Sequence, residues 1–114
     1  MQYNSDFKYD LEVGQAGERL LGEIIDGNKI EVKYDLKART TTNVFVEYES
    51  RGKPSGIATT EADWYAFVLS ESSIRLCRTK ELKALCRKYI GTKRDVCGGD
   101  SNTSRGILLP LTEL

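Results

Sequence analysis

Two stretches in the first half of the chain alternate between apolar and polar residues, and each is as long as a β-strand. The first begins at Lys29 and the second ends at Ser50. Successive side chains of a strand point to opposite faces, so this period of two predicts two strands. A short polar turn joins them, and we expect a β-hairpin with its apolar rows over one core. These rows are Ile30, Val32, Tyr34 and Leu36 in the first strand, and Val44, Val46 and Tyr48 in the second.

The opposite face of this expected hairpin is rich in carboxylates. It carries Glu31, Lys33, Asp35 and, at the end of the strand, Lys37 from the first strand, and Phe45, Glu47 and Glu49 from the second. Two carboxylates at about 5 Å repel by about 3 kcal/mol at an effective dielectric constant of about 20, and Lys33 among the four carboxylates does not neutralise them. A hard divalent cation such as Mg²⁺ (or Mn²⁺) takes oxygen ligands of this kind. A solvated ladder of surface ion pairs is the alternative.

The flanking residues predict helices and further strands. Residues 11–25 repeat apolar side chains with a helical period, and Glu18 lies at the border of that apolar stripe. Thr60 and Asp63 resemble a capping box, which predicts a short helix through Ala62, Trp64 and Tyr65, and we expect the two aromatic residues in the core or at an interface. The rest of the chain predicts a second hairpin, an amphipathic helix, a mobile glycine-containing loop and a final edge strand. In order, these occupy residues 67–69 and 74–77, Thr79 to Ile90, residues 92–106, and residues 107–111 around Pro110.

Basic residues gather in two places. One is the loop of residues 50–56, whose glycines, proline and cations suit an approaching phosphate. The other is the outer face of the helix that begins at Thr79, which suits contact with a DNA backbone. An ordinary solvated surface is the alternative in both places. The residues are Arg51, Lys53 and Ser55 in the loop, and Lys80, Lys83 and Arg87 on the helix.

Composition narrows the chemistry further. The 114 residues include 17 basic and 17 acidic ones, so net charge gives no support to general polyelectrolyte binding. The chain has no histidine, which excludes Ser–His and Cys–His catalysis, and its three cysteines lack the spacing of a structural zinc site. We expect one domain over residues 1–114, a cytoplasmic location and no membrane span.

The expected order of elements, together with a helix glutamate and acidic strands, resembles the PD-(D/E)XK nuclease superfamily. Gly14-Gln-Ala-Gly-Glu-Arg19 is similar to the first-helix segment of archaeal Holliday-junction resolvases, and Glu18 matches their metal-linked glutamate. The run from Glu31 to Trp64 also resembles small phage-encoded members. The resemblance covers residues 11–70. It implies an α/β (α+β) fold with a restriction-endonuclease-like core, in which helices flank a central mixed sheet.

Two placements of the family motif are open. Glu31-Val32-Lys33 has the letters of the E-x-K element, but no strand precedes it to supply the family's aspartate. Asp35 followed by Glu47-Tyr48-Glu49 fits the order and spacing better. In that placement Glu49 stands where the family has lysine, and Lys33 on the neighbouring strand would supply the amine.

The resemblance implies a Mg²⁺- or Mn²⁺-dependent DNA endonuclease, structure-specific on branched or duplex DNA and working as a homodimer. A phage-encoded member would act in the cytoplasm of its bacterial host. The alternatives are an inactive protein of the same fold that binds nucleic acid or a partner protein, and an unrelated α+β domain. The implied roles are catalysis for Lys33, Asp35, Glu47 and Glu49, metal binding for Glu18, Asp35 and Glu47, and nucleic-acid contact for Arg51, Lys53, Ser55, Lys80, Lys83 and Arg87.

Overall fold

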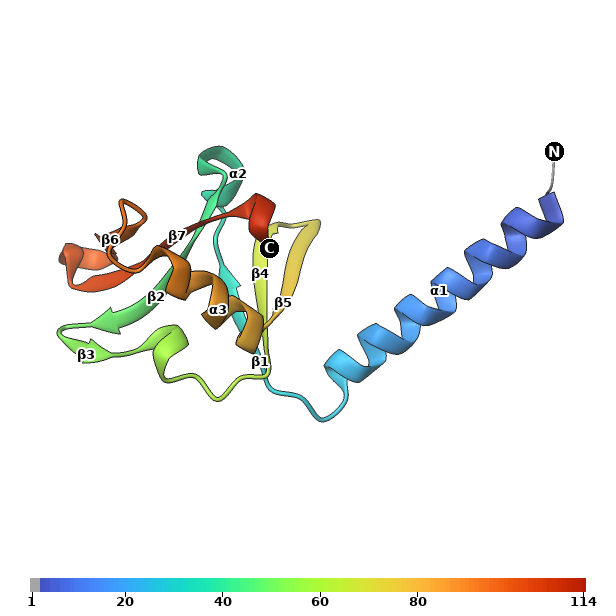
Figure 1. The fold of residues 1–114 in the computed structure, drawn as a ribbon, viewed down its shortest axis with the longest axis horizontal. Helices are drawn as coiled ribbons and strands as arrows, with labels where there is room; N and C mark the ends of the chain where they lie inside the picture. Colours follow the sequence, from blue (N-terminus) through green and yellow to red (C-terminus); the bar gives the residue numbers. More distant parts are fainter. Residues whose placement is uncertain (1–2) are drawn as a thin grey trace.

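The computed structural model describes the backbone of residues 3–114 and the side chains of residues 12–99 and 101–114 (Figure 1). The fold is α+β, with one mixed sheet, one antiparallel sheet and helices. The helices are α1 (Tyr3–Ile25), α2 (Ala38–Thr41) and α3 (Thr79–Tyr89), with 3₁₀ turns η1 (Gly56–Ala58), η2 (Asp100–Asn102) and η3 (Leu111–Glu113). The strands are β1 (Ile30–Tyr34), β2 (Asn43–Ser50), β3 (Lys53–Pro54), β4 (Trp64–Ser70), β5 (Ser73–Arg78), β6 (Asp95–Gly98) and β7 (Ser104–Pro110).

The described strands form two sheets. Sheet A has the order β1-β4-β5, in which β1 runs parallel to β4 and β5 runs antiparallel to it. Sheet B has the order β3-β2-β7-β6, and every neighbouring pair in it is antiparallel. The second predicted hairpin, β4–β5, and the predicted helix α3 are confirmed.

The predicted hairpin between Lys29 and Ser50 is wrong, because β1 and β2 belong to different sheets. The pairing of β1 with β4 continues to Asp35, whose N–H donates to the carbonyl of Val68 at 3.0 Å. The chain then turns through α2, where Ala38 is fully buried. Among the described strands β1 therefore pairs with β4 alone, at the edge of sheet A, and α2 carries the chain on to sheet B.

The hydrophobic core lies between the two sheets and under α3. Its residues come from β2, β4 and β7, from α2 and η1, and from the inner face of α3. Figure 1 shows α3 lying across the sheets near β2 and β4. The core residues are Ala38, Val44, Val46, Ile57, Tyr65, Phe67, Leu69, Leu82, Cys86, Ile107 and Leu109.

Three further predictions are corrected. Trp64 and Tyr65 begin strand β4 rather than forming a helix, and the Asp63 carboxylate accepts the N–H of Lys29 instead of capping a helix. The predicted loop of residues 92–106 contains β6 and the start of β7. β7 is not an edge strand, because it lies between β2 and β6 with Pro110 as its last residue.

Two glycines in that mispredicted loop make room for an aromatic ring. A Cβ added at Gly98 would lie 2.6 Å from the Phe45 ring, and one at Gly106 would lie 2.3 Å from it. The ring of Phe45 therefore lies directly on the backbone of β6 and β7, where any larger residue would displace it. This packing requires glycine at two positions that the sequence pattern predicted to lie in a mobile loop.

Helix α1 extends away from the two sheets and joins them through a short linker (Figure 1). Among its described side chains, Ile24 is buried and the others are exposed. Gly27 has φ +73°, and the Asn28 amide donates to the carbonyl of Glu23, so the linker itself ends the helix. Among the described residues, no helix combines the length and the apolarity needed to cross a membrane.

Candidate functional site

The two sheets meet where the end of β1 lies beside β2. One oxygen of the Asp35 carboxylate accepts the backbone N–H of Phe45 at 2.9 Å. Asp35 directly follows β1 in sheet A, and Phe45 belongs to β2 in sheet B. The side chain of Asp35 thus joins the sheets at the position where the predicted hairpin would have paired them.

A small cavity of about 120 Å³ lies at this junction. Lys33 of β1 and Glu47 of β2 both line it, so two of the predicted catalytic residues come together. They do so across the junction of the sheets rather than across a hairpin. The remaining lining residues are Phe45, Val46, Gly56, Tyr65 and Phe67.

The charged groups at the cavity have near neighbours. Lys33 Nζ lies 3.8 Å from a carboxylate oxygen of Glu31, and both side chains are partly exposed to water. The Ser55 hydroxyl donates to the Glu47 carboxylate at 3.0 Å. Gly56 has φ +51°, and a Cβ there would lie 2.3 Å from the Glu47 carbonyl oxygen. The chain therefore returns tightly against β2 and brings Ser55 to Glu47.

Tyr65 supplies a buried polar group beside the same cavity. Only 2% of this residue is exposed, and its hydroxyl makes no hydrogen bond of ordinary geometry. Burial raises the pKa of this phenol, whereas the nearby Thr60 side chain acts in the opposite direction. A buried hydroxyl without a partner costs free energy that a bound ligand or water would recover.

The donor atoms at the junction suit a hard cation only in part. Glu47 lines the cavity, whereas Asp35 does not, and one of the Asp35 carboxylate oxygens accepts the Phe45 N–H at the same junction. Carboxylate oxygens are the ligand type that Mg²⁺ prefers. Within residues 12–99 and 101–114, no three Asp, Glu, Cys or His side chains are grouped closely enough to hold a metal ion by themselves. This donor set fits a cation that completes its coordination with water and substrate phosphate, as Mg²⁺ commonly does.

The structure places the other predicted site residues apart from the cavity lining. Glu18 lies exposed on α1, which extends away from both sheets (Figure 1). A bulge at Tyr48 lies between Glu47 and Glu49 and interrupts the alternation that put both on one face. Arg51 and Lys53 are exposed in the tight turn and strand that follow β2.

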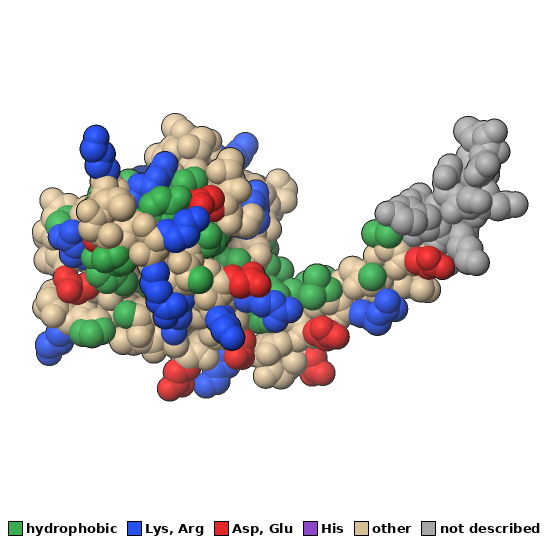
Figure 2. Space-filling model, in the orientation of Figure 1, with side chains coloured by type: hydrophobic (Ala, Val, Ile, Leu, Met, Phe, Trp, Pro, Cys, Tyr) green, Lys and Arg blue, Asp and Glu red, His purple; other side chains and the backbone are tan. Residues whose placement is uncertain are grey.

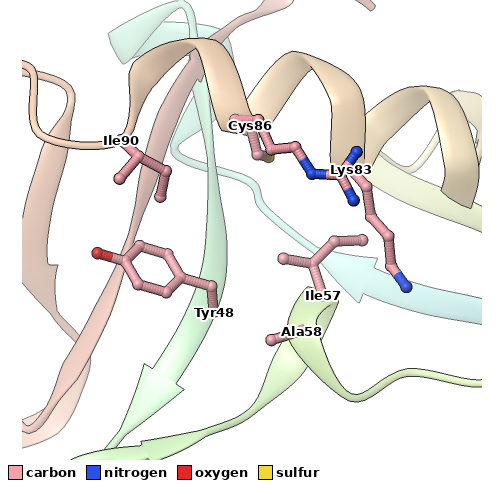
Figure 3. Close-up of a pocket in the computed structure, with 7 residues that line it drawn as sticks. Tyr48, Ile57, Ala58, Lys83, Cys86 and Ile90 are labelled. Atoms are coloured by element: carbon pink, nitrogen blue, oxygen red, sulfur yellow. The ribbon is translucent and has the colours of Figure 1, made fainter.

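A second cavity, of about 270 Å³, lies between η1 and α3 (Figure 3). Tyr48 and Ile57 form one wall, and α3 forms the other (Figure 3). Lys83 and Arg87 line it, while Lys80 is exposed one turn earlier on the same helix. The basic face predicted for α3 thus borders a largely apolar cleft. The complete lining is Tyr48, Ile57, Ala58, Lys83, Cys86, Arg87 and Ile90.

Sequence reasoning missed a charged network behind this cleft. Asp95 accepts hydrogen bonds from the Tyr48 hydroxyl and from the Gly91 N–H, and Arg105 lies 3.4 Å from it. Burial alone would raise the pKa of Asp95, but these three neighbours outweigh it and lower the pKa. Burial and the bond to Asp95 raise the pKa of Tyr48. In the sequence, the one indication of this network is that Asp95 lies four positions after Gly91, the glycine predicted to end the helix.

Comparison with known proteins adds no family to this geometry. No protein-family model matches the chain, and neither a curated protein nor a solved structure resembles it significantly.

Proposed function

We propose that the chain is a metal-dependent DNA endonuclease of the PD-(D/E)XK type, with its site at the junction of β1 and β2. One observation carries the proposal. Lys33 and Glu47 come from different sheets and yet line one cavity beside the Asp35–Phe45 bond. An amine and carboxylates around a small open site are the groups that metal-assisted phosphodiester hydrolysis uses.

Each residue has a defined task in this proposal. Asp35 and Glu47 would hold Mg²⁺ or Mn²⁺, which supplies Lewis acidity at a phosphoryl oxygen. Ser55 fixes the Glu47 carboxylate through its hydrogen bond. Lys33 lines the cavity and would present its positive charge to a phosphate. Arg51, which directly follows β2, would contact the flanking DNA backbone.

The restriction-endonuclease-like core belongs to this proposal as well. The order of elements from α1 through β1 and β2 supports it, as does the resemblance of residues 11–70 to the superfamily. The direct pairing of β1 with β4 departs from the hairpin that this resemblance implied. Of the two motif placements, the proposal uses Asp35 with Glu47, because Glu47 lines the cavity and the Asp35–Phe45 bond lies at the same junction.

The test is cleavage of a DNA panel with Mg²⁺ or Mn²⁺, comprising plasmid, linear duplex, four-way junction and single strand. We expect cleavage that needs metal and falls by about 10²-fold or more in Glu47→Gln and in Lys33→Met. Glu61→Gln is the matched control, because Glu61 is 84% exposed and, within the part of the chain that the structure describes, forms an ion pair only with the exposed Lys29. Equal Mn²⁺ affinity in wild type, Asp35→Ala and Glu47→Ala would refute the site.

A second candidate function is favoured by the cleft beneath α3. Lys83 and Arg87 border a cleft floored by Tyr48 and Ile57, which suits a nucleic-acid strand held without turnover. Glu49 in the place of the family's lysine favours the same alternative. Anisotropy of labelled DNA in EDTA tests it, since Lys83→Glu would then weaken binding and flatten its salt dependence. Unchanged binding in Lys83→Glu would remove this candidate.

A further inference from the structure

The outer face of sheet A is apolar, and it is open to solvent mainly along its two outer strands, while Ala66 at its centre is 6% exposed. The strand register places residues of β1, β4 and β5 side by side in three rows on the face opposite the core residues Tyr65 and Phe67. Tyr34 is 77% exposed and Ile74 is 61% exposed. Eight of the nine positions are apolar, which is unusual for a surface in water. They are Ile30, Val32, Tyr34, Trp64, Ala66, Val68, Ile74 and Leu76, with Arg78 as the ninth.

Helix α1 carries an apolar stripe of matching character. Val13, Leu20, Leu21 and Ile25 are all about half exposed or more, and they project to one side of the helix. Figure 2 shows hydrophobic side chains at the surface along α1 and where it joins the rest of the molecule. Helices of this length gain most of their stability from packing such a stripe, so the stripe calls for a partner surface.

Three glycines inside α1 increase its dependence on a partner surface. Gly14, Gly17 and Gly22 lie inside α1, and a Cβ at any of them would have no neighbour within 4 Å. Glycine in a helix interior is destabilising, because it loses more backbone freedom on folding than other residues. Within this single chain, Ile24 is the one described side chain of α1 that is buried, so a helix with three such positions depends on further contacts along the rest of its stripe.

The two surfaces agree in size. The residues from Val13 to Ile25 span about 20 Å at 1.5 Å per residue, and a helix is about 10 Å wide. The strands of sheet A are about 16–23 Å long at 3.3 Å per residue, and the outer two lie about 10 Å apart. The face therefore accommodates one helix along its strands.

Charge favours the same match. Tyr3–Ile25 contains five acidic and two basic residues, whereas residues 26–114 contain 12 acidic and 15 basic ones. Arg78 is the only charged residue among the nine positions of the face, and it lies over the Trp64 ring at 4.6 Å. An acidic helix is thus attracted to the remainder of the chain.

We propose that α1 of one copy docks on the outer face of sheet A of a second copy. The linker favours a second copy over the same chain, because Gly27 and the Asn28–Glu23 bond hold α1 pointing away from its own sheet. A reciprocal exchange gives two equal contacts about a two-fold axis and leaves neither surface open. This inference stands on surfaces remote from the nuclease site and does not rest on the proposed function.

Light scattering after gel filtration of the full chain gives the first test. We expect a mass twice 12.8 kDa that falls to one chain on dilution. Leu20→Glu should give monomers at all concentrations, since Leu20 lies in the stripe and its exposed position in one chain lets the variant fold. Gln15→Glu adds the same charge on the opposite side of α1 and should stay dimeric.

Mixing two variants shows which chain supplies the helix. Leu20→Glu disrupts the apolar stripe of α1 and leaves the outer face of sheet A intact. Tyr34→Glu disrupts that face and leaves the stripe of α1 intact. Each alone should be monomeric, and their mixture should recover dimers through the one intact pairing. Trp64, the chain's single tryptophan, lies on the face and should shift its emission to the blue when the mixture forms.

Three results would overturn the proposal. Wild-type monomers whose Trp64 emission shifts in Leu20→Glu independently of concentration would mean that α1 docks on its own chain. Dimers that survive Leu20→Glu would place the interface elsewhere. Dimers of Tyr34→Glu alone would mean that two α1 helices pair with each other.

Discussion

The carboxylate of Asp95 joins β6 to β2 and to the end of α3, and its removal should be costly. It accepts the Tyr48 hydroxyl at 2.7 Å and the Gly91 N–H at 2.8 Å, and Arg105 Nε lies 3.4 Å away. The Asp95 side chain is 4% exposed, so water does not replace these partners. Hydrogen bonds to a charged group contribute about 1.5–3 kcal/mol each. We predict that Asp95→Ala lowers the free energy of unfolding by about 3–5 kcal/mol.

Two milder variants separate the parts of this effect. Asp95→Asn keeps an acceptor for Tyr48 but turns an amide group toward other donors, so we expect a smaller loss of about 2–3 kcal/mol. Tyr48→Phe removes one hydrogen bond and should cost about 1–2 kcal/mol. The losses should not add in the double variant, because both residues belong to one network.

The same carboxylate gives the stability a defined dependence on pH. The pKa of Asp95 is lowered in the folded chain, so the unfolded chain binds the proton more readily. The stabilisation is complete above the unfolded pKa of about 3.9 and is lost as the pH falls through the lower folded value. The difference between wild type and Asp95→Asn should therefore shrink in acid.

Urea unfolding followed by the fluorescence of Trp64 measures all of these quantities. Titrations at neutral pH and below about pH 4 give the two free energies to compare. Glu61→Gln, at a site 84% exposed, should stay within about 0.5 kcal/mol of wild type. The reasoning fails if Asp95→Ala unfolds within about 1 kcal/mol of wild type at neutral pH, or if its deficit is unchanged in acid.

Two further predictions follow from packing and from thiol burial. Gly106→Ala should lower stability by about 2–3 kcal/mol, because the new Cβ would lie 2.3 Å from the Phe45 ring, and a normal urea midpoint would contradict that contact. Gly22→Ala is its control, since a Cβ there has no neighbour within 4 Å and improves helix propensity. For the thiols, the exposed Cys97 should react with a disulfide reagent near pH 8 far faster than Cys86, whose pKa burial raises to about 12. Equal native rates would refute the burial of Cys86.

The alternation of residues predicted that β1 and β2 are strands, but it did not predict their partners. A period of two shows which residues share a face, whereas the partner depends on the whole topology. Here β1 pairs with β4, so that Glu31 lies beside Tyr65 while Val32 is 52% exposed. The apolar row of β1 faces outward, although the alternation of residues, taken without knowledge of the partner strand, predicted that it faces the core.

The capping box failed for a different reason. Thr60 does accept a backbone N–H, from Ala62, but this local bond shapes a turn and no helix follows. Asp63 instead accepts the N–H of Lys29, from a segment 34 residues earlier. Short polar motifs are compatible with several local structures, and distant contacts select among them.

The candidate site was predicted in part. Lys33 and Glu47 were expected to approach each other, and the structure brings both to one cavity. The prediction put both residues on the face of a hairpin away from the core, whereas in the structure Lys33 lies on the core side of sheet A, beside Phe67, so the two residues meet for a different reason. Tyr65 was expected in the core or at an interface, but its unpaired hydroxyl beside the cavity depends on atomic packing that no sequence period encodes.

The long reach from β2 to β7 has a consequence for the order in which the chain acquires its structure during synthesis. Asn43 pairs with Pro110 and Ser50 with Ser104, so the partner residues of β2 come 54 to 67 positions later. At about 5–20 residues per second, a ribosome needs about 3–13 s to make that interval. During those seconds β2 has both its apolar side chains and one of its edges without their final cover, which is the state that molecular chaperones recognise. Sheet A needs only the chain through β5, so it can form before β7, which pairs with β2 in sheet B, has been synthesised.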